Sequence, residues 1–223
     1  MDTCPFRRRY YIGVKNINLK KNLKLYVITD RRFKDEVESV REALEGGATS
    51  IQLRLKGVPT REMIKIGREI RKLTEEYGAL YLVNDRLDVA LGVNADGVHV
   101  GQEDMPVEVI KEIAPNLIVG ISASNIKEAI MGEKKGGDYI GAGSVYPTKT
   151  KEDAKYIGLE GLRRIVESVN IPVVAIGGIN HKNVREVLKL GVNGVAVISA
   201  IVGSKNVMEE SRKMRKIVDE YIE

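Results

Sequence analysis

Two positively charged side chains and an amide alternate with leucines along one short stretch of the sequence. Gln52, Arg54 and Lys56 are separated by Leu53 and Leu55. Successive side chains of a β-strand point to opposite faces, so the three polar groups would share one face and the two leucines the other. A buried charge needs a partner. The polar face therefore lies either at a solvated sheet edge or in a site that binds an anion.

Two aspartates supply charge of the opposite sign. Asp85 follows the apolar run of residues 79–83, and Asp104 follows the run of residues 97–100 after a short loop. Each aspartate alone could cap a helix N-terminus. Mg²⁺, however, is typically held by one or two carboxylates together with waters and substrate phosphate oxygens. Taken together with Arg54 and Lys56, the aspartates indicate a metal-bound diphosphate.

A second group of residues is suited to binding a single phosphate. Thr148, Thr150 and Lys151 add hydroxyls and a charge to a polar loop. The Gly177-Gly178 pair would let a ligand approach backbone N–H groups closely, although it could also be only a tight turn. Ile198-Ser199 is expected to open the final helix, whose N-terminus favours anions. The pattern predicts a monophosphate site.

No side chain is placed as a covalent nucleophile. The chain has two histidines: His99 lies within an expected strand and is interpreted as a core residue, and His181 follows a turn near the surface. The single cysteine, Cys4, lies near the N-terminus. The predicted chemistry is therefore the metal-assisted departure of diphosphate, not covalent catalysis.

The elements that must position these residues are eight short apolar runs alternating with amphipathic helices. The runs, rich in Val and Ile, have the composition of strands buried on both faces. We predict an α/β fold, a single-domain (β/α)₈ TIM barrel whose site lies at the C-terminal strand ends. A doubly wound open sheet is the alternative, but the first turn, residues 29–32, lacks a Gly-rich fingerprint. The expected strands are residues 25–30, 50–54, 79–83, 97–100, 117–120, 139–142, 172–176 and 194–198.

Charge divides the chain into an N-terminal extension, residues 1–22, and a barrel domain, residues 23–223. The chain carries 36 Lys and Arg against 31 Asp and Glu, a net charge of +5. The extension holds six basic residues and one acidic residue, which leaves 30 of each sign in the barrel domain. A nucleic-acid-binding domain would carry a basic patch, so no nucleic-acid partner is expected.

Other sequence features favour a cytoplasmic location. No apolar run approaches the length of a transmembrane helix, and residues 1–22 lack the apolar segment of a signal peptide. One cysteine cannot form an internal disulfide framework. The sequence does not determine the oligomeric state, and a homo-oligomer is compatible with it.

The polar stretches, in this order and spacing, resemble the thiamine-phosphate synthase family over about residues 24–200. The resemblance implies that a hydroxymethylpyrimidine diphosphate is joined to a thiazole phosphate, giving thiamine phosphate and diphosphate. It also implies a dissociative mechanism, in which diphosphate leaves first and the thiazole nitrogen captures the resulting carbocation. The stretches that match are residues 52–56, 83–85, 99–106, 120–122, 147–151 and 175–179.

The resemblance also implies a role for each candidate residue. The pyrimidine diphosphate would be held by Gln52, Arg54, Lys56, Asn84, Ser122 and Lys151, and among these we expect Arg54, Lys56, Ser122 and Lys151 to be catalytic. Asp85 and Asp104 would hold Mg²⁺. The thiazole phosphate would be held by Thr148, Thr150, Gly178, Ile198 and Ser199.

Two departures from the family pattern bear on the alternatives. Leu55 stands where the family usually has Glu, and because it faces away from Arg54 the site should be unaffected. Ser124 stands where a thiazole tautomerase of the same fold carries a catalytic His, which argues against that reaction. A non-catalytic thiazole- or thiamine-phosphate-binding protein is a further alternative, but a sensor has little need for a diphosphate and metal site.

Overall fold

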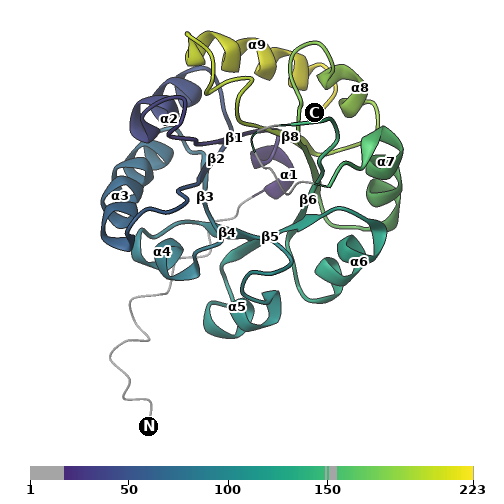
Figure 1. Cartoon of the computed structure of the whole chain (residues 1–223), viewed down its shortest axis with the longest axis horizontal. Coiled ribbons are helices and arrows are strands. Elements are labelled where there is room, and N and C mark those ends of the chain that lie inside the picture. Colours follow the sequence, from purple (N-terminus) through teal and green to yellow (C-terminus); the bar gives the residue numbers. More distant parts are fainter. Residues whose placement is uncertain (1–17, 149, 151–154, 223) are drawn as a thin grey trace.

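Eight parallel strands form a closed barrel in the computed structural model, which describes residues 18–148, 150 and 155–222. Each strand pairs with the next along the chain, and β8 pairs with β1 (Figure 1). The predicted (β/α)₈ fold is thus confirmed. The strands are β1 (Leu25–Ile28), β2 (Ser50–Leu53), β3 (Leu80–Asn84), β4 (Gly97–Val100), β5 (Ile118–Ala123), β6 (Tyr139–Ala142), β7 (Val173–Ile176) and β8 (Gly194–Val197).

Helices surround the barrel and follow its strands in turn (Figure 1). They are α2 (Glu36–Glu45), α3 (Thr60–Glu76), α4 (Leu87–Gly92), α5 (Val107–Ile113), α6 (Ile126–Lys134), α7 (Gly158–Ser168), α8 (Val184–Leu188) and α9 (Val207–Asp219). A short helix, α1 (Leu19–Asn22), precedes β1. Leu19 in α1 packs against the apolar cluster inside the barrel. The domain boundary after residue 22 stays a prediction, although residues 18–22 already belong to the described fold.

Alternation along the strands separates two hydrophobic layers. Tyr26, Leu82 and Tyr139 lie in the cluster inside the barrel. Leu53 and Leu55 join the larger cluster between the barrel and its helices. Gln52, whose neighbours Ile51 and Leu53 both belong to that outer cluster, is 2% exposed, and its amide reaches the inward-facing Tyr26. The facing predicted for β2 is therefore confirmed.

The start of the last helix differs from expectation. The last helix, α9, begins at Val207, where Asn206 accepts a hydrogen bond from the Glu209 N–H, not at Ile198-Ser199. Residues 198–204 instead form consecutive tight turns. The backbone hydrogen bonds there join residues three or four positions apart, but they do not continue into a regular helix. Within the described part of the chain, no helix combines the length and hydropathy needed to cross a membrane.

Candidate active site

The ends of β2, β3 and β4 bring together one lysine and two aspartates. Lys56 Nζ lies 2.6 Å from Asp85 Oδ2. Asp85 has a φ of 62°, and its N–H donates to the His99 carbonyl of β4 at 2.8 Å. Asp104 accepts a hydrogen bond from the Gly101 N–H at 2.7 Å. The backbone thus turns both carboxylates toward the same corner of the mouth.

Neither aspartate caps a helix, so the capping alternative is wrong for both. The N-cap positions of α4 and α5 are Arg86 and Pro106, and neither makes a side-chain cap bond. Burial raises the pKa of the Asp104 carboxyl, and the negative charge of Asp85 raises it further, against the Gly101 hydrogen bond. Two carboxylates that repel each other in this way favour binding of a cation between them.

The donor set does not form a closed metal site. Across the described residues, no three His, Cys, Asp or Glu side chains cluster closely enough to hold a metal ion. A pair of carboxylates suits Mg²⁺ that completes its coordination with water and phosphate oxygens. The arrangement therefore suits a metal that is shared with a substrate.

Arg54 lies beside this corner, directly after β2 and two residues before Lys56. Its backbone N–H donates to Thr29 Oγ1 at 2.9 Å. Although burial raises the pKa of Asp30, hydrogen bonds from Arg32 and the positive charges of Arg32 and Arg54 bring that pKa below its ordinary value. No salt bridge joins Arg54 to a carboxylate among the described residues, so its guanidinium is suited to a substrate anion.

The remaining residues expected around the pyrimidine extend across the barrel from β2 to β5. Gln52 Nε2 donates to Tyr26 Oη at 2.7 Å. Asn84 ends β3 in register with His99. Ser122 lies within β5, which is longer than expected, and its Oγ is 3.0 Å from His99 Nε2. His99 has both ring nitrogens hydrogen-bonded, as expected of a core histidine.

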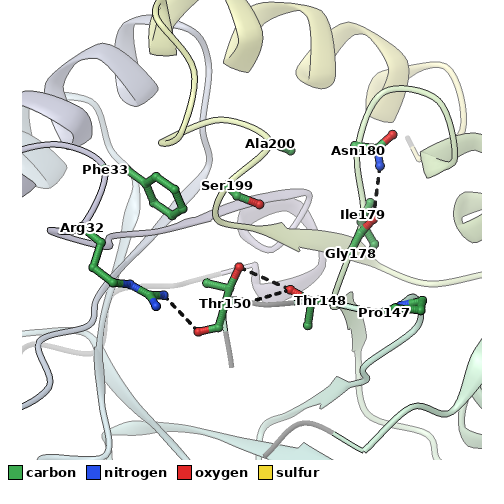
Figure 2. A pocket seen from close by; sticks show the side chains of 10 residues that line it. All are labelled: Arg32, Phe33, Pro147, Thr148, Thr150, Gly178, Ile179, Asn180, Ser199 and Ala200. Atoms are coloured by element: carbon green, nitrogen blue, oxygen red, sulfur yellow. Dashed lines mark hydrogen bonds between the residues drawn. The ribbon is translucent and has the colours of Figure 1, made fainter. Parts of the chain in front are cut away.

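The opposite side of the mouth holds a cavity of about 550 Å³ (Figure 2). Four of the five residues predicted to hold the thiazole phosphate line it: Thr148, Thr150, Gly178 and Ser199. The fifth, Ile198, packs against the apolar cluster inside the barrel. The full lining is Arg32, Phe33, Pro147, Thr148, Thr150, Gly178, Ile179, Asn180, Ser199 and Ala200.

The Gly177-Gly178 turn needs glycine for its backbone conformation, and Gly178 also lies open to the cavity. Their φ angles are 102° and 65°, in the region that favours glycine. A Cβ at Gly178 would lie 2.7 Å from Tyr146 Cβ and 2.8 Å from the Pro147 carbonyl oxygen. The tight-turn reading is thus correct, and it is compatible with the phosphate reading because Gly178 also lines the cavity.

Arg32 and Asn180 are cavity residues that the sequence analysis missed. Arg32 Nη2 donates to the Thr150 carbonyl at 3.1 Å (Figure 2) and pairs with the buried Asp30 at 2.6 Å. The signal was present, because the turn at residues 29–32 follows β1 and so lies at the mouth like the other strand ends. Lys151 lies outside the described residues.

Comparisons with known proteins agree with this geometry. The family model described as thiamine monophosphate synthase matches residues 25–201. "Thiamine-phosphate synthase" of Pyrococcus furiosus is 67% identical over 206 residues, which cover 92% of this chain and 100% of that protein. The protein of the same name from Methanococcus maripaludis is 58% identical over 206 residues, which likewise cover 92% of this chain and 100% of that protein.

Solved structures extend the likeness to three dimensions. "Thiamine phosphate pyrophosphorylase" from Pyrococcus furiosus has a TM-score of 0.89 at 65% identity, covering 92% of this chain and 100% of that one. A 3-hexulose-6-phosphate synthase, at 17% identity and a TM-score of 0.63, shares the fold alone. From the family match and the high identity of these relatives, the chain belongs to the thiamine monophosphate synthase family.

Proposed function

We propose that this chain is a thiamine-phosphate synthase. It joins 4-amino-2-methyl-5-(diphosphooxymethyl)pyrimidine to a thiazole phosphate and releases thiamine phosphate and diphosphate. The observation that carries the proposal is the placement of two different anion-binding groups around one barrel mouth. Lys56, Asp85 and Asp104 lie at the ends of β2 to β4, and the cavity lined by Thr148 and Thr150 lies on the far side.

Asp85 and Asp104 are the residues that would hold Mg²⁺. Their mutual repulsion and the two-carboxylate donor set fit an ion that is also bound by diphosphate oxygens. When bound, Mg²⁺ would neutralise charge on the diphosphate as that group leaves.

The side chains of β2 act on the same leaving group. Arg54 and Lys56 place positive charge where negative charge grows on the diphosphate oxygen as the carbon–oxygen bond breaks. The electron pair of that bond leaves with the diphosphate, and the lone pair of the thiazole nitrogen then forms the new carbon–nitrogen bond. Lys151 would add a third positive charge from the loop after β6. Gln52, Asn84 and Ser122 would hold the pyrimidine in line.

The cavity beside β6 to β8 holds the phosphate of the second substrate. Thr148, Thr150 and Ser199 supply hydroxyl donors, and Gly178 leaves its backbone open to a ligand. Arg32 fixes the Thr150 carbonyl at the rim. Holding each substrate by its own phosphate group keeps the reacting atoms in a fixed relation, which is a large part of catalysis in a reaction without a covalent intermediate.

A synthesis assay tests the proposal and separates it from the alternatives. Folded protein is incubated with both substrates and Mg²⁺, and thiamine phosphate and diphosphate are measured. We expect both products in equal amounts and neither after Mg²⁺ is chelated. Isomerisation of the thiazole without Mg²⁺ would indicate a tautomerase, and calorimetric binding without diphosphate release would indicate a binding protein. Either result with no thiamine phosphate contradicts the proposal.

The same proposal fits a protein of the cytoplasm acting on small molecules. Both substrates are charged and water-soluble, and the chain needs neither a nucleic acid nor a membrane for this reaction. Assembly into a homo-oligomer is compatible with the proposal, because all the proposed site residues come from one chain.

A further inference from the structure

A continuous chain of hydrogen bonds crosses the inside of the barrel between two proposed pyrimidine-binding residues. Gln52 Nε2 donates to Tyr26 Oη at 2.7 Å, and Tyr26 Oη lies 3.1 Å from Tyr139 Oη. Tyr139 Oη lies 2.9 Å from His99 Nδ1, and His99 Nε2 lies 3.0 Å from Ser122 Oγ. The chain links β2, β1, β6, β4 and β5, and the two ends that it joins both belong to the proposed pyrimidine site.

The barrel interior is built to accommodate this chain. Such interiors are usually filled by Val, Ile and Leu, yet Tyr26 and Tyr139 are 2% and 0% exposed. Gly120 of β5 leaves room for the Tyr139 ring, which a Cβ there would overlap. Gly141 of β6 leaves room for His99, whose Cε1 would lie 2.8 Å from a Cβ. Glycine inside a strand weakens it, so two such positions indicate a specific need for these rings.

The direction of donation along the chain follows from its first member. The Gln52 amide nitrogen can only donate, so Tyr26 accepts and gives its own proton to Tyr139. Tyr139 in turn donates to His99 Nδ1, and His99 must then carry its proton on Nε2 and donate it to Ser122. Burial raises the pKa of both tyrosines well above their ordinary value, so both hydroxyls keep their protons at neutral pH.

We propose that Tyr26 and Tyr139 are positioning residues that hold His99 as its Nε2–H tautomer and thereby present Ser122 as a donor and Gln52 as an acceptor to the aminopyrimidine. Ser122 accepts from His99, so its own proton is available to a ring nitrogen. Gln52 donates a side-chain N–H to Tyr26, so its side-chain carbonyl oxygen is available to accept from an amino group. The inference rests on the proposed function, because it takes Gln52 and Ser122 as pyrimidine ligands.

Removing one hydroxyl from the middle of the chain is the kinetic test. Tyr139→Phe removes the hydroxyl that contacts both His99 Nδ1 and Tyr26 Oη, and we expect kcat/KM for the pyrimidine diphosphate to fall about tenfold. The KM for the thiazole phosphate should not change, because that substrate binds on the other side of the mouth. Tyr26→Phe should act in the same direction.

Tyr81→Phe is the matched control. Tyr81 is 0% exposed and lies in the outer hydrophobic layer on β3. Its hydroxyl has no hydrogen-bond partner within the described structure. The variant therefore loses the same atom, a hydroxyl oxygen, from a buried tyrosine that does not belong to the hydrogen-bond chain. Its kinetics should match those of the wild type. Equal kinetics for Tyr139→Phe and Tyr81→Phe would overturn the proposal.

The His99 tautomer provides a readout that does not depend on turnover. The protein has two histidines, so ¹⁵N-histidine NMR of the wild type and of His181→Gln assigns the His99 signals. We expect the Nε2–H form in the wild type and a mixture of tautomers in Tyr139→Phe. A wild-type Nδ1–H form, or a tautomer unaffected by Tyr139→Phe, would overturn the proposal.

The two readouts also separate this inference from the function on which it rests. Folded wild-type protein that makes no thiamine phosphate would overturn the proposed function and the positioning role with it. Loss of the Nε2–H tautomer in Tyr139→Phe would, in that case, still support the ordered hydrogen-bond chain. Normal synthesis with an unchanged tautomer in Tyr139→Phe would overturn this inference and leave the proposed function in place.

Discussion

Replacing Gly178 with alanine should weaken both the fold and the binding of the thiazole phosphate. Gly178 has a φ of 65° and lines the cavity with Thr148. An added Cβ would lie 2.7 Å from Tyr146 Cβ, 2.8 Å from the Pro147 oxygen and 3.0 Å from the Tyr146 carbonyl carbon. Two of these three neighbours are backbone atoms, so the loop that carries Thr148 has to move.

The size of the effect follows from two separate costs. An L-residue in the left-handed region costs about 1–2 kcal/mol, and overpacking adds about 1–3 kcal/mol. We therefore expect the free energy of unfolding to fall by about 2–5 kcal/mol. Displacement of Thr148 would remove a hydrogen bond to a charged phosphate, worth about 1.5–3 kcal/mol, so KM for the thiazole phosphate should rise about 10- to 100-fold.

Gly78→Ala isolates the backbone cost from the packing cost. Gly78 has the same φ of 65°, but nothing lies within 4 Å of the Cβ position. Unfolding in guanidinium chloride should show a loss of only about 1–2 kcal/mol for this variant, and its KM should be unchanged. Equal losses of stability for the two variants, with equal KM values, would contradict a packing cost at Gly178 and its role beside the phosphate.

Three further predictions follow from the charged groups. Mg²⁺ with diphosphate should stabilise the wild type by about 2.7 kcal/mol at a hundredfold excess over Kd, which raises its melting temperature. Asp104→Asn should abolish this rise in melting temperature; a retained rise contradicts the metal role. Lys56→Met should change the free energy of unfolding by less than about 1 kcal/mol, because the Lys56 side chain is 63% exposed. Its turnover should nevertheless fall on the order of 100-fold. The control Lys72→Met, whose side chain is 72% exposed in the wild type, should leave turnover unchanged. Arg71→Met should cost about 3 kcal/mol in a denaturant titration, because Arg71 and Asp96 pair at 3.0 Å with both side chains buried, and KM should not change; a loss below about 1 kcal/mol would contradict the role of this pair.

Strand alternation was enough to predict how the side chains of β2 face. It placed Gln52 inward and Leu53 and Leu55 outward, as the structure has them. The rule that parallel strands end at one mouth brought Lys56 and Asp85 together from 29 positions apart. These predictions succeeded because they depend on the local period of the chain and on one topological rule.

Features that depend on closure of the barrel could not be read from the sequence. The contact between Tyr26 and Tyr139 joins residues 113 positions apart, and neither tyrosine differs in pattern from an ordinary core residue. Ile198-Ser199 was expected to open a helix because it lies at the end of an expected strand, but Asn206 supplies the side-chain cap eight residues after Ile198, and α9 begins at Val207. Competing start signals are resolved by tertiary packing, which a single sequence does not display.

We propose that one barrel mouth holds a metal-bound diphosphate on one side and a monophosphate on the other. A crystal structure with Mn²⁺, diphosphate and the thiazole phosphate tests it most directly, because Mn²⁺ can be located by its anomalous scattering. We expect an anomalous peak between Asp85 and Asp104 in contact with the diphosphate, and the thiazole phosphate beside Thr148 and Ser199. A metal bound elsewhere, or both phosphates on the same side, would contradict it.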